Sequence, residues 1–384
     1  MRALPAASIG KDALYTIPGM PPTLIDPPKG DAFACRNEQA LAIDYEEEPP
    51  MFRISDTHFA ASWMLDARAQ QSVRHSPEET TSVSVHPRCM LPENAEILLD
   101  VRHLSQVYTL PGGRTAKALD DVSFQIRKGE IFGLVGESGS GKSTLIQHLN
   151  GLIEPQSGKV YVDGADIWSK QNRKQIRRVR FQVGLCFQYP EYQIFEEDVY
   201  KEIAFGPKQM GLDSEEIRRR VFHSMELVGL SRDFAEQSPF DLSGGQKRRV
   251  AIASILAMEP KVLILDEPCA GLDPRGRDQI LDLIRSYRDR TGATVLFVSH
   301  SMEDVARICR RVLVMHRGQV AAYGPVADVY ANAEKLRQMG LNVPQVTDIF
   351  LELRRRGVPC RTDIFTVDDG VREFQRLKRE GVRL

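Results

Sequence analysis

The sequence lacks any apolar run close to the roughly 20 residues that a membrane-spanning helix needs. Net charge is also nearly absent, since 51 Lys and Arg residues balance 52 Asp and Glu residues, so bulk charge predicts no nucleic-acid partner. The six cysteines form no Cys-x-x-Cys pair, which argues against a zinc site or a disulfide framework and favours a reducing, cytosolic setting. The N-terminus has no apolar block typical of a signal peptide. We therefore expect any membrane association to come through protein partners.

Residues 1–93 differ in composition from everything after them. Pro-Pro pairs interrupt them repeatedly, and an acidic run occupies residues 46–48. Because apolar residues rarely recur there at helix or strand spacing, we expect an irregular appendage of loops and short elements. The pattern becomes β-rich at Ile97, so we expect the working protein to start between Met90 and Ile97.

The remainder of the chain alternates between strand and helix patterns. We expect strands at residues 98–108, 118–126, 131–135, 183–187, 262–265, 295–298 and 312–315. We expect helices at residues 214–227, 245–258, 273–288, 327–331, 333–339, 346–356 and 371–380. Such alternation implies an α/β domain, over residues 94–325, whose mostly parallel sheet is covered on both faces. Residues 326–384 are expected to form a helical C-terminal extension.

Residues 136–143, Gly-Glu-Ser-Gly-Ser-Gly-Lys-Ser, match the pattern G-x-x-x-x-G-K-[ST] between a predicted strand and a helix. In a P-loop of this kind the glycines let backbone amides and the helix N-terminus surround phosphate groups. Lys142 would reach the β- and γ-phosphates, and the hydroxyl of Ser143 would ligate Mg²⁺. An ordinary Gly-rich turn is the alternative, but the complete pattern in this context favours nucleotide binding.

The apolar run at residues 262–265 ends in two carboxylates, Asp266 and Glu267. Asp266, at the carboxyl end of the strand, is expected to hold Mg²⁺. Glu267 would orient or deprotonate the attacking water. A buried strand with a solvated acidic end would look the same in isolation, so the prediction depends on the P-loop.

Leu242-Ser243-Gly244-Gly245-Gln246 begins a predicted helix. Ser243 is a plausible N-cap, and the glycines bare the amides at the positive end of the helix. A cap alone would require only the serine, so two glycines indicate close approach to another molecule. Together with the P-loop and the strand that ends in Asp266-Glu267, this motif resembles those of the ATP-binding-cassette (ABC) ATPases.

That resemblance implies a P-loop nucleotide-binding domain with an antiparallel β subdomain, a helical signature subdomain and a helical C-terminal extension. It implies that ATP is hydrolysed between two such domains, each site being completed by the Ser-Gly-Gly-Gln of the other. Gln188 would sense the γ-phosphate and Mg²⁺, His300 would contact the γ-phosphate, and Tyr108 would stack on adenine. Cys269 departs from the Ser or Thr common in the family, with no expected loss of hydrolysis.

The expected nucleotide-binding residues are Tyr108, Gly136, Glu137, Ser138, Gly139, Ser140, Gly141, Lys142, Ser143, Thr144, Ser243, Gly244, Gly245, Gln246 and Asp273. The expected catalytic residues are Glu267, His300, Lys142 and Gln188, and the expected Mg²⁺ ligands are Ser143, Asp266 and Gln188.

Further stretches resemble one branch of the family, the ATPases of energy-coupling factor (ECF) importers, and most closely their second, A-prime type. They lie at residues 187–197, 202–207, 258–261, 273–278, 299–304 and 341–347. The resemblance implies pairing with a related ATPase or a second copy, and docking of a transmembrane T subunit on residues 189–229. A separate S subunit would bind the vitamin or metal ion. The chain would then be a peripheral protein on the cytoplasmic face of the cell membrane.

Two segments before the P-loop resemble different proteins, the oligopeptide-importer ATPases. Residues 16–22 and 49–61 are similar to the C-terminal tail of such an ATPase, and residues 97–104 and 121–136 to the start of another. Peptide import is therefore an alternative function. A soluble, non-transport ABC ATPase is a second alternative, disfavoured by the single cassette and the lack of a heptad insertion. A degenerate fusion that never assembles is a third, although its catalytic motifs are intact.

Overall fold

The computed structural model of the chain describes residues 51–55, 58–61, 95–109 and 113–382. The chain divides into two compact units, Met1–Pro87 and Arg88–Leu384. In the first unit, β1 (Met51–Ser55) and β2 (His58–Ala61) form an antiparallel pair with Met51 opposite Ala61. The rest of the expected N-terminal appendage lies outside the described residues.

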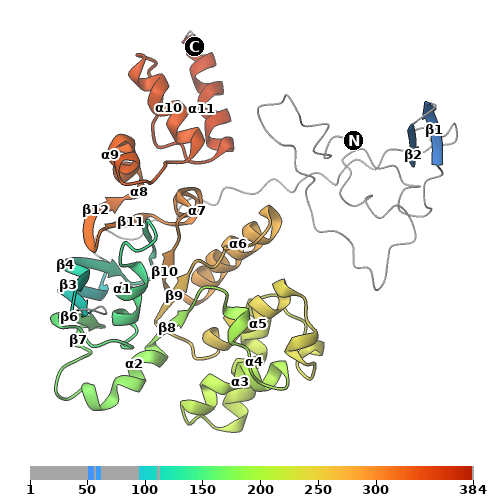
Figure 1. The fold of residues 1–384 in the computed structure, drawn as a ribbon. Coiled ribbons are helices and arrows are strands. Elements are labelled where there is room, and N and C mark those ends of the chain that lie inside the picture. Colours follow the sequence, from blue (N-terminus) through green and yellow to red (C-terminus); the bar gives the residue numbers. More distant parts are fainter. Residues whose placement is uncertain (1–50, 56–57, 62–94, 110–112, 383–384) are drawn as a thin grey trace. The chain divides into compact units, whose positions relative to one another are not determined.

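A six-stranded sheet forms the centre of the second unit, with the strand order β12-β11-β5-β10-β9-β8 (Figure 1). Its strands are β5 (Ile131–Gly136), β8 (Val183–Cys186), β9 (Val262–Asp266), β10 (Thr294–Val298), β11 (Arg311–His316) and β12 (Gln319–Pro325). All neighbouring pairs are parallel except β11 and β12, which are antiparallel. This mostly parallel sheet confirms the predicted α/β class.

A second, antiparallel sheet has the order β4-β3-β6-β7. It consists of β3 (Ile97–Thr109), β4 (Thr115–Arg127), β6 (Ser157–Val162) and β7 (Ala165–Asp166). Side chains from this sheet, from the central sheet and from α1 (Lys142–Leu149) share one hydrophobic cluster. The first helix after β5 is thereby fixed between the two sheets.

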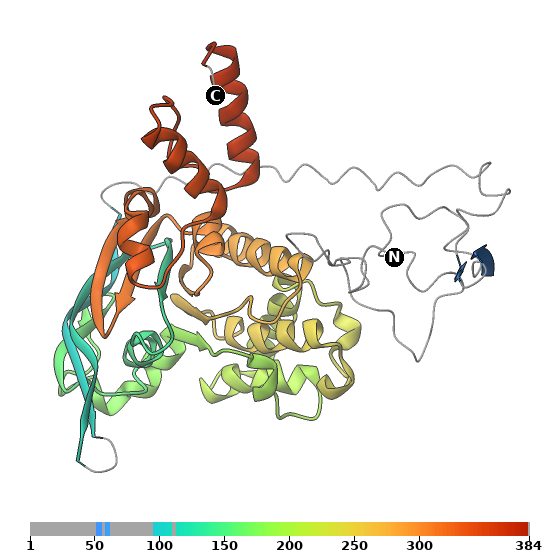
Figure 2. The ribbon, with the colours of Figure 1, turned by 45° about the horizontal axis from the view of Figure 1, so that its top comes forward.

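The other helices are α2 (Ile176–Gln182), α3 (Val199–Gln209), α4 (Ser214–Leu227), α5 (Gly244–Leu256), α6 (Pro274–Thr291), α7 (Met302–Ile308), α8 (Val326–Ala331), α9 (Ala333–Gln338), α10 (Gln345–Arg355) and α11 (Val367–Arg379). Val179 of α2 lies in the same hydrophobic cluster as α1, whereas the remaining helices cover the opposite face of the central sheet or extend from it (Figures 1 and 2). Among the described residues, none of the helices combines the length and apolar character that crossing a bilayer demands.

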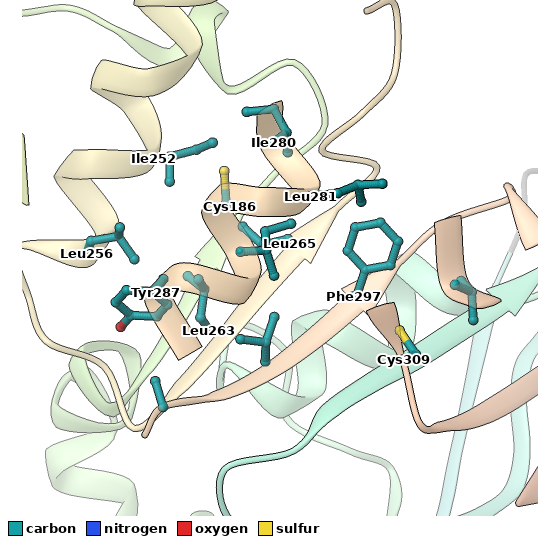
Figure 3. Close-up of a cluster of buried hydrophobic side chains, with 14 of the residues drawn as sticks. Cys186, Ile252, Leu256, Leu263, Leu265, Ile280, Leu281, Tyr287, Phe297 and Cys309 are labelled. Carbon is teal, nitrogen blue, oxygen red and sulfur yellow. The ribbon is translucent and has the colours of Figure 1, made fainter. Parts of the chain in front are cut away.

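Alternation along β9 shows how the sequence divides the core between two faces. Val262 and Ile264 belong to the cluster that holds α1, whereas Leu263 and Leu265 belong to the larger cluster under α5 and α6 (Figure 3). Successive side chains of a strand point to opposite faces, and a strand covered on both faces must be apolar throughout. A third, small cluster around Phe350 and Leu377 joins α10 to α11.

Candidate nucleotide-binding site

The P-loop connects the end of β5 at Gly136 with the start of α1 at Lys142. Gly141, the N-cap of α1, has φ of 104°, and a Cβ there would lie 2.5 Å from the carbonyl oxygen of Ala118. Glycine alone satisfies both constraints. The first turn of α1 leaves backbone amides without intrahelical acceptors at the positive end of the helix, which is a favourable place for phosphate.

Lys142 folds back over the P-loop. Its Nζ donates hydrogen bonds to the carbonyl oxygens of Gly136, at 2.7 Å, and Glu137, at 2.9 Å. Burial lowers the pKa of Lys142, and the nearby carboxylates of Glu267 and Asp266 oppose that shift. The ammonium group is therefore held between the loop and the acidic end of β9.

The turn between β11 and β12 is hydrogen-bonded to the P-loop. The sequence patterns do not predict this contact. The amide of Gly318 donates to the carbonyl oxygen of Ser140 at 3.0 Å, and the carbonyl of Gly318 accepts from the amide of Asp120 at 2.8 Å. Gly318 has φ of 79°, and a Cβ there would lie 2.9 Å from the carbonyl oxygen of Ala118. A side chain at position 318 would therefore clash with the backbone of β4, against which this turn packs.

Asp266 and Glu267 end β9 beside the P-loop lysine. Burial and the neighbouring charge of Glu267 raise the pKa of Asp266 to about 6, while Lys142 opposes the rise. Glu267 has φ of 51°, a left-handed conformation that a non-glycine residue rarely adopts, and its amide donates to the carbonyl of Val298 at 2.9 Å. Backbone strain of this kind is concentrated at functional sites.

His300 follows β10 and contacts Glu267, which follows the neighbouring strand β9. Its Nδ1 lies 2.8 Å from Oε2 of Glu267, and its side chain is 71% exposed whereas that of Glu267 is 12% exposed. The structure thus brings four of the predicted site residues to one edge of the central sheet, namely Lys142, Asp266, Glu267 and His300.

Gln188 and Tyr108 have no contact with these four residues that the structure records, and only Gln188 lies at the same edge of the sheet. Gln188 is exposed and follows β8, whose Cys186 pairs with Leu265 of the parallel strand β9, and it precedes Tyr189, whose φ is 53°. Tyr108 is 38% exposed near the end of β3 in the antiparallel sheet. Gln106 in the same strand lies 3.3 Å from Nε2 of the buried His148 of α1, which links this strand to the P-loop helix.

The Ser-Gly-Gly-Gln motif begins α5, on the helical side of the unit and away from α1 (Figure 1). Ser243 and Gln246 form a capping box: Oγ of Ser243 accepts from the amide of Gln246, and Oε1 of Gln246 accepts from the amide of Ser243. Gly244 and Gly245 are exposed, and a Cβ at either would meet nothing within 4 Å. Asp273 caps α6, its carboxylate accepting from the amide of Gly276 at 2.8 Å.

Cys269 stands between the acidic pair and Asp273. Burial raises the pKa of its thiol to about 12, so the thiol stays protonated at neutral pH. We therefore expect it to be a packing residue and not a nucleophile, in line with the prediction that it leaves hydrolysis intact.

Comparison with known proteins agrees with this geometry. The family described as ABC transporter matches residues 119–270. The energy-coupling factor transporter ATP-binding protein EcfA2 of Caldanaerobacter subterraneus subsp. tengcongensis is 49% identical over 281 residues, which cover 73% of this chain and 98% of that protein.

Two solved structures extend the comparison. The structure of cbiO1 from Clostridium perfringens, part of the ABC transporter complex cbiONQ, has a TM-score of 0.56 and 36% identity, covering 68% of this chain and 98% of that one. The ATP-binding cassette MJ0796, dimeric and bound to ADP and Pi, has a TM-score of 0.53 and 26% identity, covering 60% and 99%. These similarities favour neither the peptide-importer nor the non-transport alternative. The chain belongs to the ATP-binding proteins of energy-coupling factor transporters, which are ABC ATPases that hydrolyse ATP to energise import.

Proposed function

We propose that this cassette works in a pair, with ATP held between the P-loop of one cassette and residues 243–246 of the other. The observation that supports this most directly is the open space at Gly244 and Gly245. Alanine would fit there without a clash inside the chain and is the better helix former. The glycines therefore need a reason outside the chain, and a phosphate group approaching the helix N-terminus supplies one.

Mg²⁺ fits the donors that surround this site. Ser143, Asp266 and Gln188 offer a hydroxyl, a carboxylate and an amide oxygen, the hard ligands that Mg²⁺ prefers. Mg²⁺ usually binds through one or two carboxylates together with substrate phosphates. When bound, Mg²⁺ supplies positive charge against the phosphate oxygens.

The acidic edge of the sheet supplies the groups for hydrolysis. Glu267 would accept a hydrogen bond from the attacking water and orient it towards the γ-phosphate. His300, which lies against the same carboxylate, would hold it in place and contact the γ-phosphate. Lys142 would exchange its bonds with the loop carbonyls for bonds with the β- and γ-phosphates.

Partner subunits would connect the cassette to the cytoplasmic face of the membrane. Exposed aromatic side chains gather where the T subunit is expected to dock: Tyr192 is 84% exposed, Phe195 59% and Phe205 41%. Phe195 and Phe205 line a hollow of about 280 Å³, which Met258 also lines. Large exposed apolar patches mark protein interfaces. An S subunit would then deliver the vitamin or transition-metal ion.

Affinity purification of the tagged chain from solubilised membranes tests this proposal. We expect a second cassette, or a second copy, to copurify with a T subunit and an S subunit. Phe195→Ser should reduce recovery of the membrane subunits while leaving ATP binding intact, because Phe195 lies on the exposed patch and not at the P-loop. Recovery of peptide-permease subunits in their place would contradict the proposal.

A further inference from the structure

Arg248 is a buried cation in α5, two residues after the Ser-Gly-Gly-Gln motif, and is only 4% exposed. Its guanidinium forms a two-point ion pair with Glu191: Nη2 lies 2.7 Å from Oε1 and Nε lies 3.1 Å from Oε2. The same group donates from Nη1 to the carbonyl oxygens of Ala270, at 2.9 Å, and Pro268, at 3.3 Å. This side chain of α5 thus contacts two other segments, one at Glu191 and one at Pro268–Ala270.

The segments joined by Arg248 all belong to the proposed ATP machinery. Glu191 lies in the short 3₁₀ helix η7 (Pro190–Gln193), which follows Gln188 and precedes the exposed aromatic patch. Pro268 and Ala270 form the turn directly after Glu267, and the amide of Ala270 donates to the carbonyl of Glu267 at 3.0 Å. Arg248 therefore lies between the expected docking segment and the backbone that carries the expected catalytic carboxylate.

A second contact connects the same two segments. A Cβ built on Gly271 would lie 3.6 Å from Cε1 of Tyr189, so the tyrosine ring packs against the glycine that follows Ala270. Both Tyr189 and Glu267 have left-handed backbone conformations, with φ of 53° and 51°. Strained backbone persists only where surrounding contacts fix it.

Arginine is the residue that can make this set of contacts. Its planar group offers donors in a fixed fork, which matches a carboxylate on one side and leaves further donors for carbonyls on the other. Lysine would keep the charge but not the fork. Because a charge so deeply buried must be paired, Glu191 is the necessary counter-ion of Arg248.

From this geometry we propose that Arg248 is a positioning residue for ATP hydrolysis, acting through the turn at Pro268–Ala270 to place Glu267, with Glu191 tying that turn to the docking segment. The inference rests on the proposed catalytic role of Glu267. It assigns Arg248 no contact with ATP, so removing it affects turnover and not nucleotide affinity. Misplacement of a catalytic group by about 1 Å lowers turnover by about 10²-fold.

The experiment compares Arg248→Gln, Arg248→Lys and Glu191→Gln with the double variant Arg248→Gln/Glu191→Gln, each in the full chain with its copurifying subunits. Three quantities are measured: kcat, the dissociation constant for a fluorescent ATP analogue, and the melting temperature. Arg311→Gln is the matched control. Arg311 pairs with the buried Glu130 at 3.3 Å and lies over the rings of Phe132 and Tyr323, at the start of β11 and thus at the end of the central sheet opposite to the Glu267 turn.

We expect Arg248→Gln and Arg248→Lys to lower kcat by roughly 10- to 100-fold with ATP affinity changed less than about twofold. The double variant removes both buried charges, so it should recover melting temperature relative to Arg248→Gln without recovering kcat. Arg311→Gln should lower the melting temperature and leave kcat within about twofold.

Two results would overturn the inference. One is a loss of kcat that follows melting temperature across the series, Arg311→Gln included, because that is the behaviour of a purely structural ion pair. The other is normal kcat in a folded Arg248→Lys protein. Glu267→Gln is assayed alongside: if it hydrolyses ATP normally, the proposed catalytic site itself fails, whatever Arg248 does.

Discussion

Nδ1 of His300 lies 2.8 Å from Oε2 of Glu267, although the two residues follow different strands of the central sheet. The contact places the carboxylate that is expected to orient water next to the histidine that is expected to contact the γ-phosphate. Four predictions about the site and the surrounding fold can be tested.

Replacing Glu267 by Gln should abolish most hydrolysis and preserve ATP binding. The amide keeps the shape of the side chain but cannot accept a proton from water, so kcat should fall by about 10²- to 10⁴-fold. Steady-state ATPase assays and equilibrium binding of a fluorescent ATP analogue measure the two effects. Glu303→Gln, at an exposed carboxylate on the neighbouring helix, is the control and should hydrolyse ATP normally. Near-normal turnover of Glu267→Gln in the assembled complex would remove Glu267 from the mechanism.

Replacing Lys142 by Ala should weaken nucleotide binding itself. The ammonium group is held over the P-loop, where a charge-assisted hydrogen bond contributes about 1.5–3 kcal/mol, so affinity should fall by roughly 10- to 100-fold. Lys128→Ala, at an exposed lysine before β5 and thus at the opposite end of that strand, should leave affinity unchanged. Equal affinities of the Lys142→Ala and wild-type proteins would show that the lysine does not contact the phosphates.

Replacing Ser243 by Arg should block the site of the opposing cassette while leaving ATP binding at the variant's own P-loop intact. In dimers of two copies, mixing the Ser243→Arg and Lys142→Ala proteins should restore hydrolysis. Each mixed dimer then pairs an intact P-loop from one chain with an intact Ser-Gly-Gly-Gln motif from the other. Mixtures no more active than the separate variants, with dimers confirmed by light scattering, would contradict a shared site.

His148 should make the fold less stable in acid. Burial lowers its pKa in the folded state, opposed by its hydrogen bond to the carbonyl of Thr144, whereas the unfolded value is about 6.5. The unfolded chain therefore binds more protons below about pH 6.5, so the free energy of unfolding falls as pH falls, by at most about 1.4 kcal/mol per pH unit. Urea unfolding at about pH 5 and about pH 7.5 should show a smaller difference for His148→Gln than for wild type. Identical differences in the two proteins would contradict this role.

Much of the fold can be predicted from the sequence because its main elements have strong local patterns. The helix predicted at residues 214–227 is α4, and the apolar run at residues 262–265 is the core of β9. The helix expected from Val371 instead begins at Val367, four residues earlier, because its N-cap and not its apolar spacing sets the start. Thr366 begins the helix earlier by accepting from the amide of Asp369.

The sequence does not predict elements and contacts that depend on distant partners. β12 is half-exposed, contains Ala, Gly and Tyr, and exists as a strand through its antiparallel pairing with β11. In the same way, Glu191 lies in a stretch that resembles the family and Arg248 follows the 242–246 motif by two residues, but neither pattern predicts the ion pair between them. The site residues can be recognised one by one from their motifs. The contacts that support them join segments far apart in the sequence, so they can be seen only in the folded chain.

Deleting residues 1–89 should leave ATPase activity and thermal stability nearly unchanged. The hydrophobic clusters of the described cassette begin at Leu98, and each strand or helix that positions the site lies after Ile97. Thermal unfolding and ATPase assays of the truncated and full-length proteins, each with copurifying subunits, make the comparison. Equal melting temperatures and ATPase rates would show that the cassette folds and works from about Met90 onward. A truncated chain that melts several degrees lower, or that no longer copurifies with its membrane partners, would show instead that the first 89 residues have become a structural or docking element.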